Sequence, residues 1–194
     1  MSFKVGDKVI YPNQGVGVIE NVATRKIGGQ DEQFYMVRLT ANDSTVMVPI
    51  SNVDNVGMRT LSDDSQVKKL FGVLRSDFSE PDPDWKTRYK LNLEKMNSGE
   101  ICEVARVLRN LYYLSFRKSL SFREKKMFDR ARTLVISEIA TVKQQEFEQT
   151  EEEVVHRAKQ QFRHWAESRG PEWKLVALRV PFASVTDSEI RVTH

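Results

Sequence analysis

Short apolar runs alternate with turn residues over the first sixty positions, and this pattern predicts a β-rich unit. The runs "KVIY", "VGVIENVAT", "QFYMVRL" and "TVMV" are separated by clusters such as Gly28-Gly29 and residues 41–44, and the last run stops at Pro49. Strands that recur at roughly ten-residue spacing are typical of a small antiparallel sheet or barrel. We therefore expect a domain over residues 1–60, of the size of an SH3-like or Tudor-like module.

The apolar period becomes helical after Leu61. In residues 62–76 the apolar side chains fall at i, i+3, i+4 and i+7, and similar stripes run through residues 101–112 and 127–139. Asp84 is a good N-cap, and Ser121 with Glu124 matches a capping box. Short-looped helices of this kind predict a compact all-α bundle over residues 61–143, with the proline-containing segment 77–84 as a linker.

Residues 144–194 differ in character from the bundle. A long charged stretch, amphipathic through Val154, Val155, Ala158, Phe162 and Trp165, ends at Gly170-Pro171 and is followed by the strand-like run "WKLVALRVPF". The pattern leaves open whether this region docks on the bundle, pairs with another chain or is partly disordered. The expected fold class is α+β and multidomain: a small Tudor/SH3-like antiparallel β-barrel, a compact helical bundle, and an uncharacterised C-terminal extension.

Composition narrows the possible functions. The sequence has one cysteine, Cys102, and three scattered histidines, so neither a disulfide nor a metal site is expected. No apolar run is long enough to span a membrane, and the first residues lack a signal-peptide core, which predicts a cytoplasmic protein. No arrangement of nucleophile and base is visible, so we expect neither enzymatic activity nor a cofactor.

The positive charge is concentrated in the middle of the chain. Residues 83–133 contain 13 Lys and Arg against six Asp and Glu, a local charge of +7, whereas the first sixty residues are neutral. Such a concentration fits either a nucleic-acid footprint or a basic solvated face, and charge alone does not separate the two. Gly15-Val16-Gly17 invites a phosphate-loop interpretation, but it lacks a third glycine and a following helix, which favours a turn.

Two places carry side chains that suggest binding surfaces. In the run "VMVPI", strand alternation would turn Val46 and Val48 to one side and Met47 and Pro49 to the other, where Met47 is either exposed or covered by the segment that follows. Trp85 begins a predicted helix among basic residues. It is either the end of a buried stripe with Tyr89, Leu93 and Met96, or a ring directed outward. Phe122 also lies in a first turn with basic neighbours.

The residues resemble a known family in several separate motifs. "FKVGDKVIYPNQGVGVIE", "VMVPISNVDNVGMR", "DWKTRYKLNLEKMNSGE", "EVARVLRNLY" and "LSFREKKMFDRARTLVISEIA" closely resemble the bacterial CarD/CdnL transcription regulators, in order and over roughly residues 3–140. The resemblance does not extend beyond about residue 143.

The resemblance implies a non-enzymatic regulator that binds the β subunit of RNA polymerase and stabilises the open promoter complex. Its helical domain would place a Trp wedge in the minor groove at the upstream edge of the melted DNA. The residues implied in polymerase binding are Arg25, Met47 and Pro49, and those in DNA binding are Trp85, Lys86, Arg88, Lys90, Phe122, Lys125 and Lys126. Many members carry Arg where this chain has Thr87, which puts one phosphate contact in doubt.

This role implies a nucleoid-associated protein in the cytoplasm, and we expect a monomer. The alternative is a protein-interaction module that docks RNA polymerase or a repair helicase without touching DNA.

Overall fold

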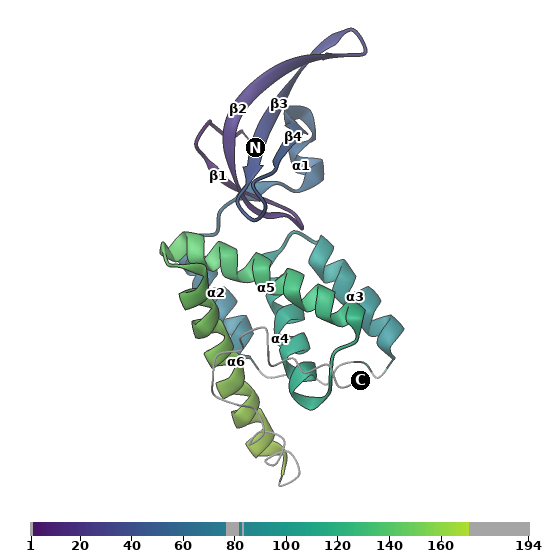
Figure 1. Ribbon diagram of the computed structural model, residues 1–194, viewed down its shortest axis with the longest axis vertical. Coiled ribbons are helices and arrows are strands. Elements are labelled where there is room, and N and C mark those ends of the chain that lie inside the picture. The colour runs from purple at the N-terminus through teal and green to yellow at the C-terminus, as the bar shows by residue number, and fades with distance from the viewer. Residues whose placement is uncertain (1, 77–81, 83, 171–194) are drawn as a thin grey trace.

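The computed structural model describes residues 2–76, 82 and 84–170. An antiparallel sheet occupies one end of the molecule and a group of helices the other, with α5 lying between the sheet and the remaining helices (Figure 1). The chain is thus an α+β protein, as the sequence pattern predicts. None of the helices in the described part of the chain is both long and apolar enough to cross a membrane.

Five antiparallel strands form the sheet, in the order β4-β3-β2-β1-β5. The long β2 and β3 pair over most of their length and form a hairpin that projects away from the helices (Figure 1). In this order β4 and β5 are the edge strands. The closure of the sheet into a barrel stays a prediction. The strand bounds are β1 Lys8–Tyr11, β2 Gly15–Ile27, β3 Gln30–Leu39, β4 Thr45–Pro49 and β5 Arg59–Thr60.

One face of the sheet is packed under two short helical turns, η1 (Ile50–Asn52) and α1 (Val53–Val56). Its core contains Val9, Ile19, Tyr35, Val37, Leu39, Val48 and Val53. Gly15 has a φ of +93°, which favours glycine, and it begins β2, while Gly17 lies inside the strand. These glycines therefore belong to a turn and a strand, as expected, and no helix follows them.

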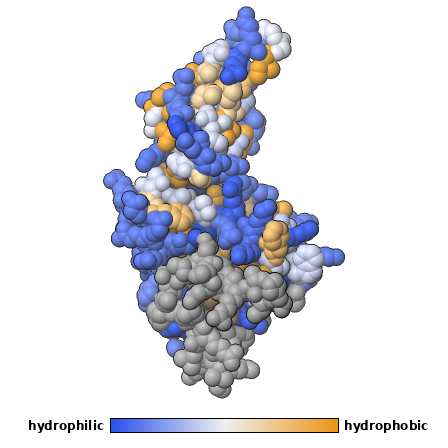
Figure 2. Space-filling view, viewed as in Figure 1, coloured by the Kyte–Doolittle hydropathy of each residue, from blue (hydrophilic) through white to orange (hydrophobic). Residues whose placement is uncertain are grey.

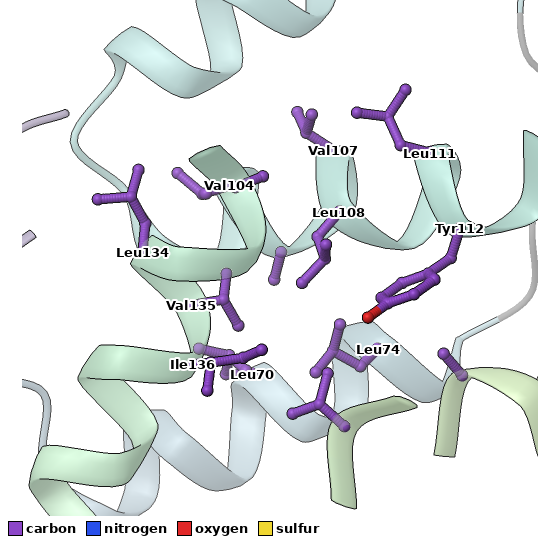
Figure 3. Close-up of a cluster of buried hydrophobic side chains, with 14 of the residues drawn as sticks. Leu70, Leu74, Val104, Val107, Leu108, Leu111, Tyr112, Leu134, Val135 and Ile136 are labelled. Carbon is purple, nitrogen blue, oxygen red and sulfur yellow. The ribbon is translucent and has the colours of Figure 1, made fainter. Parts of the chain in front are cut away.

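Five further helices form the second unit, and three of them supply most of its core. The core lies between α2, α4 and α5, where side chains such as Leu70, Leu108 and Val135 are fully or almost fully buried (Figure 3). The apolar stripes predicted for these helices are buried as expected. The helix bounds are α2 Asp64–Arg75, α3 Trp85–Asn97, α4 Ile101–Arg117, α5 Phe122–Lys143 and α6 Phe147–Arg169.

The helix α6 answers part of the question left open for the C-terminal region. Its Val154, Val155 and Ala158 join the main core, while Phe162 and Trp165 pack on Tyr113 of α4. The ring centroids of Tyr113 and Trp165 are 4.8 Å apart, edge to face. We therefore propose that the helical unit extends through α6 rather than ending near residue 143. The strand predicted at residues 173–182 lies outside the described residues.

A buried carboxylate joins the sheet to the helices. Glu138 of α5 is 1% exposed and receives two hydrogen bonds from the guanidinium of Arg59 in β5, at 2.7 and 2.8 Å. The hydroxyl of Ser62 donates to the same carboxylate at 2.5 Å. Arg59 also donates to the carbonyl of Gly99, just before α4, at 3.2 Å. Such a network, with each polar group paired, fixes the orientation of the two units.

Candidate functional site

Trp85 is the first residue of α3, and the helix start that carries it is strongly capped. The carboxylate of Asp84 accepts hydrogen bonds from the backbone N–H groups of Lys86 and Thr87, at 3.2 and 3.1 Å. The Thr87 hydroxyl also donates to Asp84 at 2.7 Å, and this bond is the largest of several that lower the pKa of the Asp84 carboxyl. The cap fixes the first turn and thereby the position of Trp85.

The Trp85 side chain is 51% exposed, so the ring is directed outward rather than sealed in the bundle. The Lys86 ammonium lies 5.9 Å from the centre of its ring, within the range of a cation–π contact. Of the two alternatives, the buried stripe through Trp85 and Leu93 is wrong, because Leu93 is also exposed. The buried residues of α3 are instead Arg88, Asn92 and Met96.

Arg88 differs from the other cations that the sequence assigns to DNA. It is 8% exposed, and its guanidinium donates through Nε and Nη2 to Glu124 of α5, at 3.1 and 2.6 Å. Nη1 donates to the Asp82 carbonyl at 2.6 Å. With all three guanidinium nitrogens bonded to the protein, Arg88 faces inward and does not lie where a phosphate could reach it readily. This geometry argues against the DNA-contact role that the resemblance implies.

Glu124 connects this pair to the start of α5. Its carboxylate accepts from the backbone N–H and the hydroxyl of Ser121, which completes the capping box predicted from the sequence. Burial raises the pKa of Glu124, but the hydrogen bonds from Arg88 and Ser121 outweigh it and hold the pKa below its ordinary value. Glu124 is therefore ionised at neutral pH, and one carboxylate holds the first turns of α3 and α5 together.

The beginning of α5 presents an aromatic ring and cations beside Trp85. Phe122 is 81% exposed, although it is a large apolar side chain. Lys126 is exposed and Lys125 is half-buried, while Lys90 lies exposed on α3. Because Arg88 and Glu124 join the two helix starts, these side chains belong to one end of the bundle. A surface with exposed aromatics among cations can stack on bases and attract phosphates.

This aromatic end lies away from the sheet. The other end of α3 is tied to the sheet by a hydrogen bond from Asn13 Nδ2 to Asn97 Oδ1, at 2.8 Å. The α5 helix also runs from its aromatic end toward the sheet, because its Leu134 lies close to the sheet. A Cβ at Gly15 of β2 would be 3.4 Å from Leu134 Cδ2. The two helices thus run side by side from the exposed aromatic rings toward the sheet.

The three residues assigned to polymerase lie on the outer face of the sheet, opposite its core. Met47 and Pro49 are half-buried on the edge strand β4, and Arg25 is exposed on β2. Register adds two residues that the sequence did not single out: Met36 pairs with Met47, and Phe34 pairs with Pro49.

Cross-strand partners share a face of a sheet, so Met36, Met47 and Pro49 form one half-buried apolar surface over the buried Phe34, with Arg25 at its rim. Figure 2 shows apolar side chains exposed among polar ones over the sheet. Alternation along β3 could have indicated Phe34 and Met36, but the pairing of β3 with β4 could not be read from the sequence.

Two family models match successive parts of the chain. Residues 3–62 match the model described as CarD-like/TRCF RID domain, and residues 69–155 match the one described as CarD, C-terminal domain. The first match covers the sheet and its short helices. The second covers α3, α4, α5 and most of α2, and it continues into α6, beyond the region in which the sequence resemblance was noted.

A similar protein from Bacillus subtilis agrees with the family models. YdeB of Bacillus subtilis (strain 168) is 34% identical over 141 residues, which cover 73% of this chain and 92% of YdeB. The solved structure of CdnLNt from Myxoccoccus xanthus is 42% identical and covers 31% of this chain and 84% of that one, with a TM-score of 0.28. The extent of the similarity to YdeB and the order of the two domain matches show that this chain belongs to the CarD/CdnL family of bacterial RNA polymerase-binding transcription regulators.

Proposed function

We propose that this protein is a non-enzymatic transcription regulator that binds the β subunit of RNA polymerase and stabilises the open promoter complex. The outer face of the sheet would hold the polymerase, and Trp85 would enter the minor groove at the upstream edge of the melted DNA. Family membership supports the general role, and YdeB is itself named as a candidate transcription factor.

The observation that carries the proposed mechanism is the exposure of Trp85 on a fixed helix start. An indole that is 51% exposed has no place in its own core, while the Asp84 cap and the Arg88–Glu124 pair hold it in position. Apolar wedges unstack base steps in the minor groove at a cost of a few kcal/mol. At the edge of a bubble the step is already weakened, so the ring meets less resistance and opposes reannealing.

Stacking free energies set the size of the effect that Trp85 would have on the open complex. Stacking of a base on an aromatic side chain contributes about 1–3 kcal/mol, and about 1.4 kcal/mol changes an equilibrium tenfold. One ring therefore suffices to change the occupancy of the open complex without reading any base. Lys86, Lys90, Lys125 and Lys126 would add affinity that is independent of sequence and sensitive to salt.

Binding to polymerase would bring the protein to the promoter, which the weak DNA contacts alone would not do. When two contacts are joined on one chain, the second forms at a high effective concentration once the first is made. Met36, Met47 and Pro49 form the apolar part of the proposed docking face, with the buried Phe34 beneath them, and Arg25 provides charge at its rim. The proposed function involves no contact with a membrane. That the protein is a monomer remains a prediction.

The lifetime of the open complex tests the wedge. We expect Trp85→Ala to shorten it about tenfold through the loss of stacking, with binding to polymerase unchanged. Leu91→Ala is the matched control, because Leu91 is 47% exposed on the same helix and, six positions on, lies about 120° around the helix axis from Trp85. An unchanged lifetime in Trp85→Ala would remove the mechanism and leave the alternative of a docking module without DNA contact.

Binding to isolated lobes of the β subunit tests the sheet. Arg25→Glu and Met47→Asp are expected to weaken the complex at least tenfold, since each places a carboxylate on the docking face. Lys8→Glu is the control, because Lys8 is exposed on β1 at a distance from β4. Equal affinity of all three variants and the unchanged protein would assign the docking to another surface.

A further inference from the structure

A groove runs along the helical unit between α3 and α5, starting next to the exposed aromatic end. Apolar side chains line it from both helices, among them Tyr89, Leu93 and Met127. Phe122 stands at one end, and Asn13 and Asn97 line the other, next to the sheet. The groove thus continues the proposed DNA-binding end toward the proposed polymerase-binding unit.

The cations along the groove have a regular spacing. Arg123, Lys126 and Arg130 lie at i, i+3 and i+7 on α5, are all exposed, and all line the groove. At 1.5 Å per residue this places a positive charge about every 5 Å along the helix axis. Neighbouring phosphates of one strand are about 3.4 Å apart along stacked DNA, and farther apart when the bases unstack.

Among the described residues that line the groove, the only carboxylate is that of Asp129, which is half-buried. Three cations against one carboxylate give the groove a positive charge, which is complementary to a phosphate backbone. The Arg123 guanidinium also lies 6.0 Å from the centre of the Tyr89 ring, so a cation and an aromatic face are presented together. Grooves that combine a basic track with stacking surfaces are typical of proteins that bind single-stranded nucleic acid.

The apolar side chains in the groove favour a single strand over a duplex as its ligand. In a duplex the base faces are stacked inside and the phosphates lie outside, so the exposed Leu93 and the half-buried Tyr89 would have nothing apolar to contact, while Met96 and Met127 beneath them are buried in the core. An unpaired strand exposes its base faces, which can lie on the exposed apolar side chains while its phosphates meet Arg123, Lys126 and Arg130. The 81% exposure of Phe122 at the entrance is explained in the same way.

We propose that the groove between α3 and α5 binds an unpaired DNA strand as it leaves the position of Trp85. This inference rests on the proposed function and extends it: Trp85 parts the strands, and the groove retains one of them. The contact is independent of base identity, because every base has a face that can stack. Of the three groove cations only Lys126 was assigned to DNA from the sequence, whereas Arg123 and Arg130 were not.

Binding of a short oligo(dT), measured by fluorescence anisotropy at several salt concentrations, tests the groove with the full chain. For a single strand, each phosphate contact contributes about 0.7 to the slope of log affinity against log salt. We expect the double variant Lys126→Ala/Arg130→Ala to reduce that slope by about 1.4 and to weaken binding at low salt. Both side chains are exposed, so the fold should be retained, which thermal melting would show.

Lys68→Ala/Lys69→Ala removes the same charge from exposed positions on α2 and is the matched control. A second variant, Leu93→Asp, places a carboxylate among the apolar side chains of the groove and is expected to weaken oligo(dT) more than a duplex of equal length. The inference is overturned if the two double variants have equal slopes and affinities for oligo(dT). It is also overturned if the groove variants weaken only the complex with polymerase, which would indicate a peptide in the groove.

The outcome is separable from that of the proposed function. If Trp85→Ala shortens the open-complex lifetime while the groove variants bind oligo(dT) like the control, the groove inference alone is wrong. If the groove variants lose oligo(dT) binding while Trp85→Ala leaves the lifetime unchanged, the wedge is wrong and the groove is retained.

Discussion

The Arg88 guanidinium lies 2.6 Å from the Glu124 carboxylate, and this ion pair joins the first turns of the helices that carry Trp85 and Phe122. Both side chains are about nine-tenths buried. A buried charge is tolerated when it is paired and hydrogen-bonded, and Asp82 and Ser121 satisfy the remaining groups. We therefore propose that the pair positions the exposed rings, since its hydrogen bonds are made within the protein.

Glu124→Gln tests this positioning role. Glutamine can still complete the capping box with Ser121, so the variant mainly removes the charge that Arg88 needs. We expect unfolding free energy to fall by about 3 kcal/mol, because one buried ion is left unpaired. Denaturation in urea would measure it. Glu94→Gln, at an exposed position on α3, should change stability by less than about 0.5 kcal/mol.

Acidification should reproduce this loss in the unchanged protein. The pKa of Glu124 is lower in the folded chain than in the unfolded one, so the unfolded chain binds the proton more readily. The stabilisation is complete above the ordinary carboxyl pKa of about 4.3, and it disappears as the pH falls through the lower folded value.

The stability difference between the unchanged protein and Glu124→Gln should accordingly shrink between pH 7 and pH 3. Chemical denaturation of both proteins across this range would show it. A difference that stays constant with pH would mean that the ionised carboxylate is not what stabilises the junction of α3 and α5.

Two glycines should respond to alanine in opposite directions. A Cβ at Gly17 would lie 2.6 Å from Val37 Cγ1 and 3.1 Å from the Arg38 carbonyl oxygen, so Gly17→Ala should lower stability by about 1–3 kcal/mol. A Cβ at Gly72 on α2 meets no atom within 4 Å, and Gly72→Ala should raise stability by about 1 kcal/mol. Thermal melting would compare them, and equal signs would contradict the prediction.

Glu138→Gln should shorten the open-complex lifetime without weakening the binding of polymerase or DNA alone. Removing one partner of a buried, hydrogen-bonded charge pair costs about 2–5 kcal/mol, and here the pair joins the sheet to α5. On the proposed function, affinity for polymerase lobes and for DNA measured separately should be retained, while the open-complex lifetime falls.

The exposed pair of Glu20 with Arg38 provides the control for this variant. Glu20→Gln should leave both stability and lifetime nearly unchanged, because exposed ion pairs contribute little. A normal lifetime in Glu138→Gln would show that the orientation of the two units does not matter to the effect.

Helices with a purely apolar buried face could be predicted from the sequence. The stripe of α2, with Val67, Leu70, Phe71 and Leu74, is buried as predicted, and the capping box at Ser121 is present. These features depend on residues three or four positions apart, so the local sequence contains the information.

The buried face of α3 could not be predicted in this way. It is formed by Arg88 and Asn92 with Met96, and a hydrophobicity pattern assigns polar residues to solvent. Arg88 is buried because Glu124, 36 positions away, accepts its hydrogen bonds. A contact at this separation leaves no periodic signal in the chain.

The candidate surfaces were predicted only in part for the same reason. Met47 could be identified from strand alternation, but its neighbours Phe34 and Met36 depend on the register between β3 and β4. The helix α6 likewise shows an amphipathic pattern, yet its packing on Tyr113 required the tertiary structure. The exposure of Trp85 was one of two interpretations, since the sequence fits both an inward and an outward ring.

The salt link of Arg59 to Glu138 has a consequence for promoter selection. On the proposed function, a sheet and helices held in one relative orientation would keep a fixed distance between the polymerase and the edge of the melted DNA. Genes would then be sorted by how quickly their DNA recloses at that distance, and not by any operator sequence. A single protein could in this way favour start sites with short-lived open complexes throughout a chromosome.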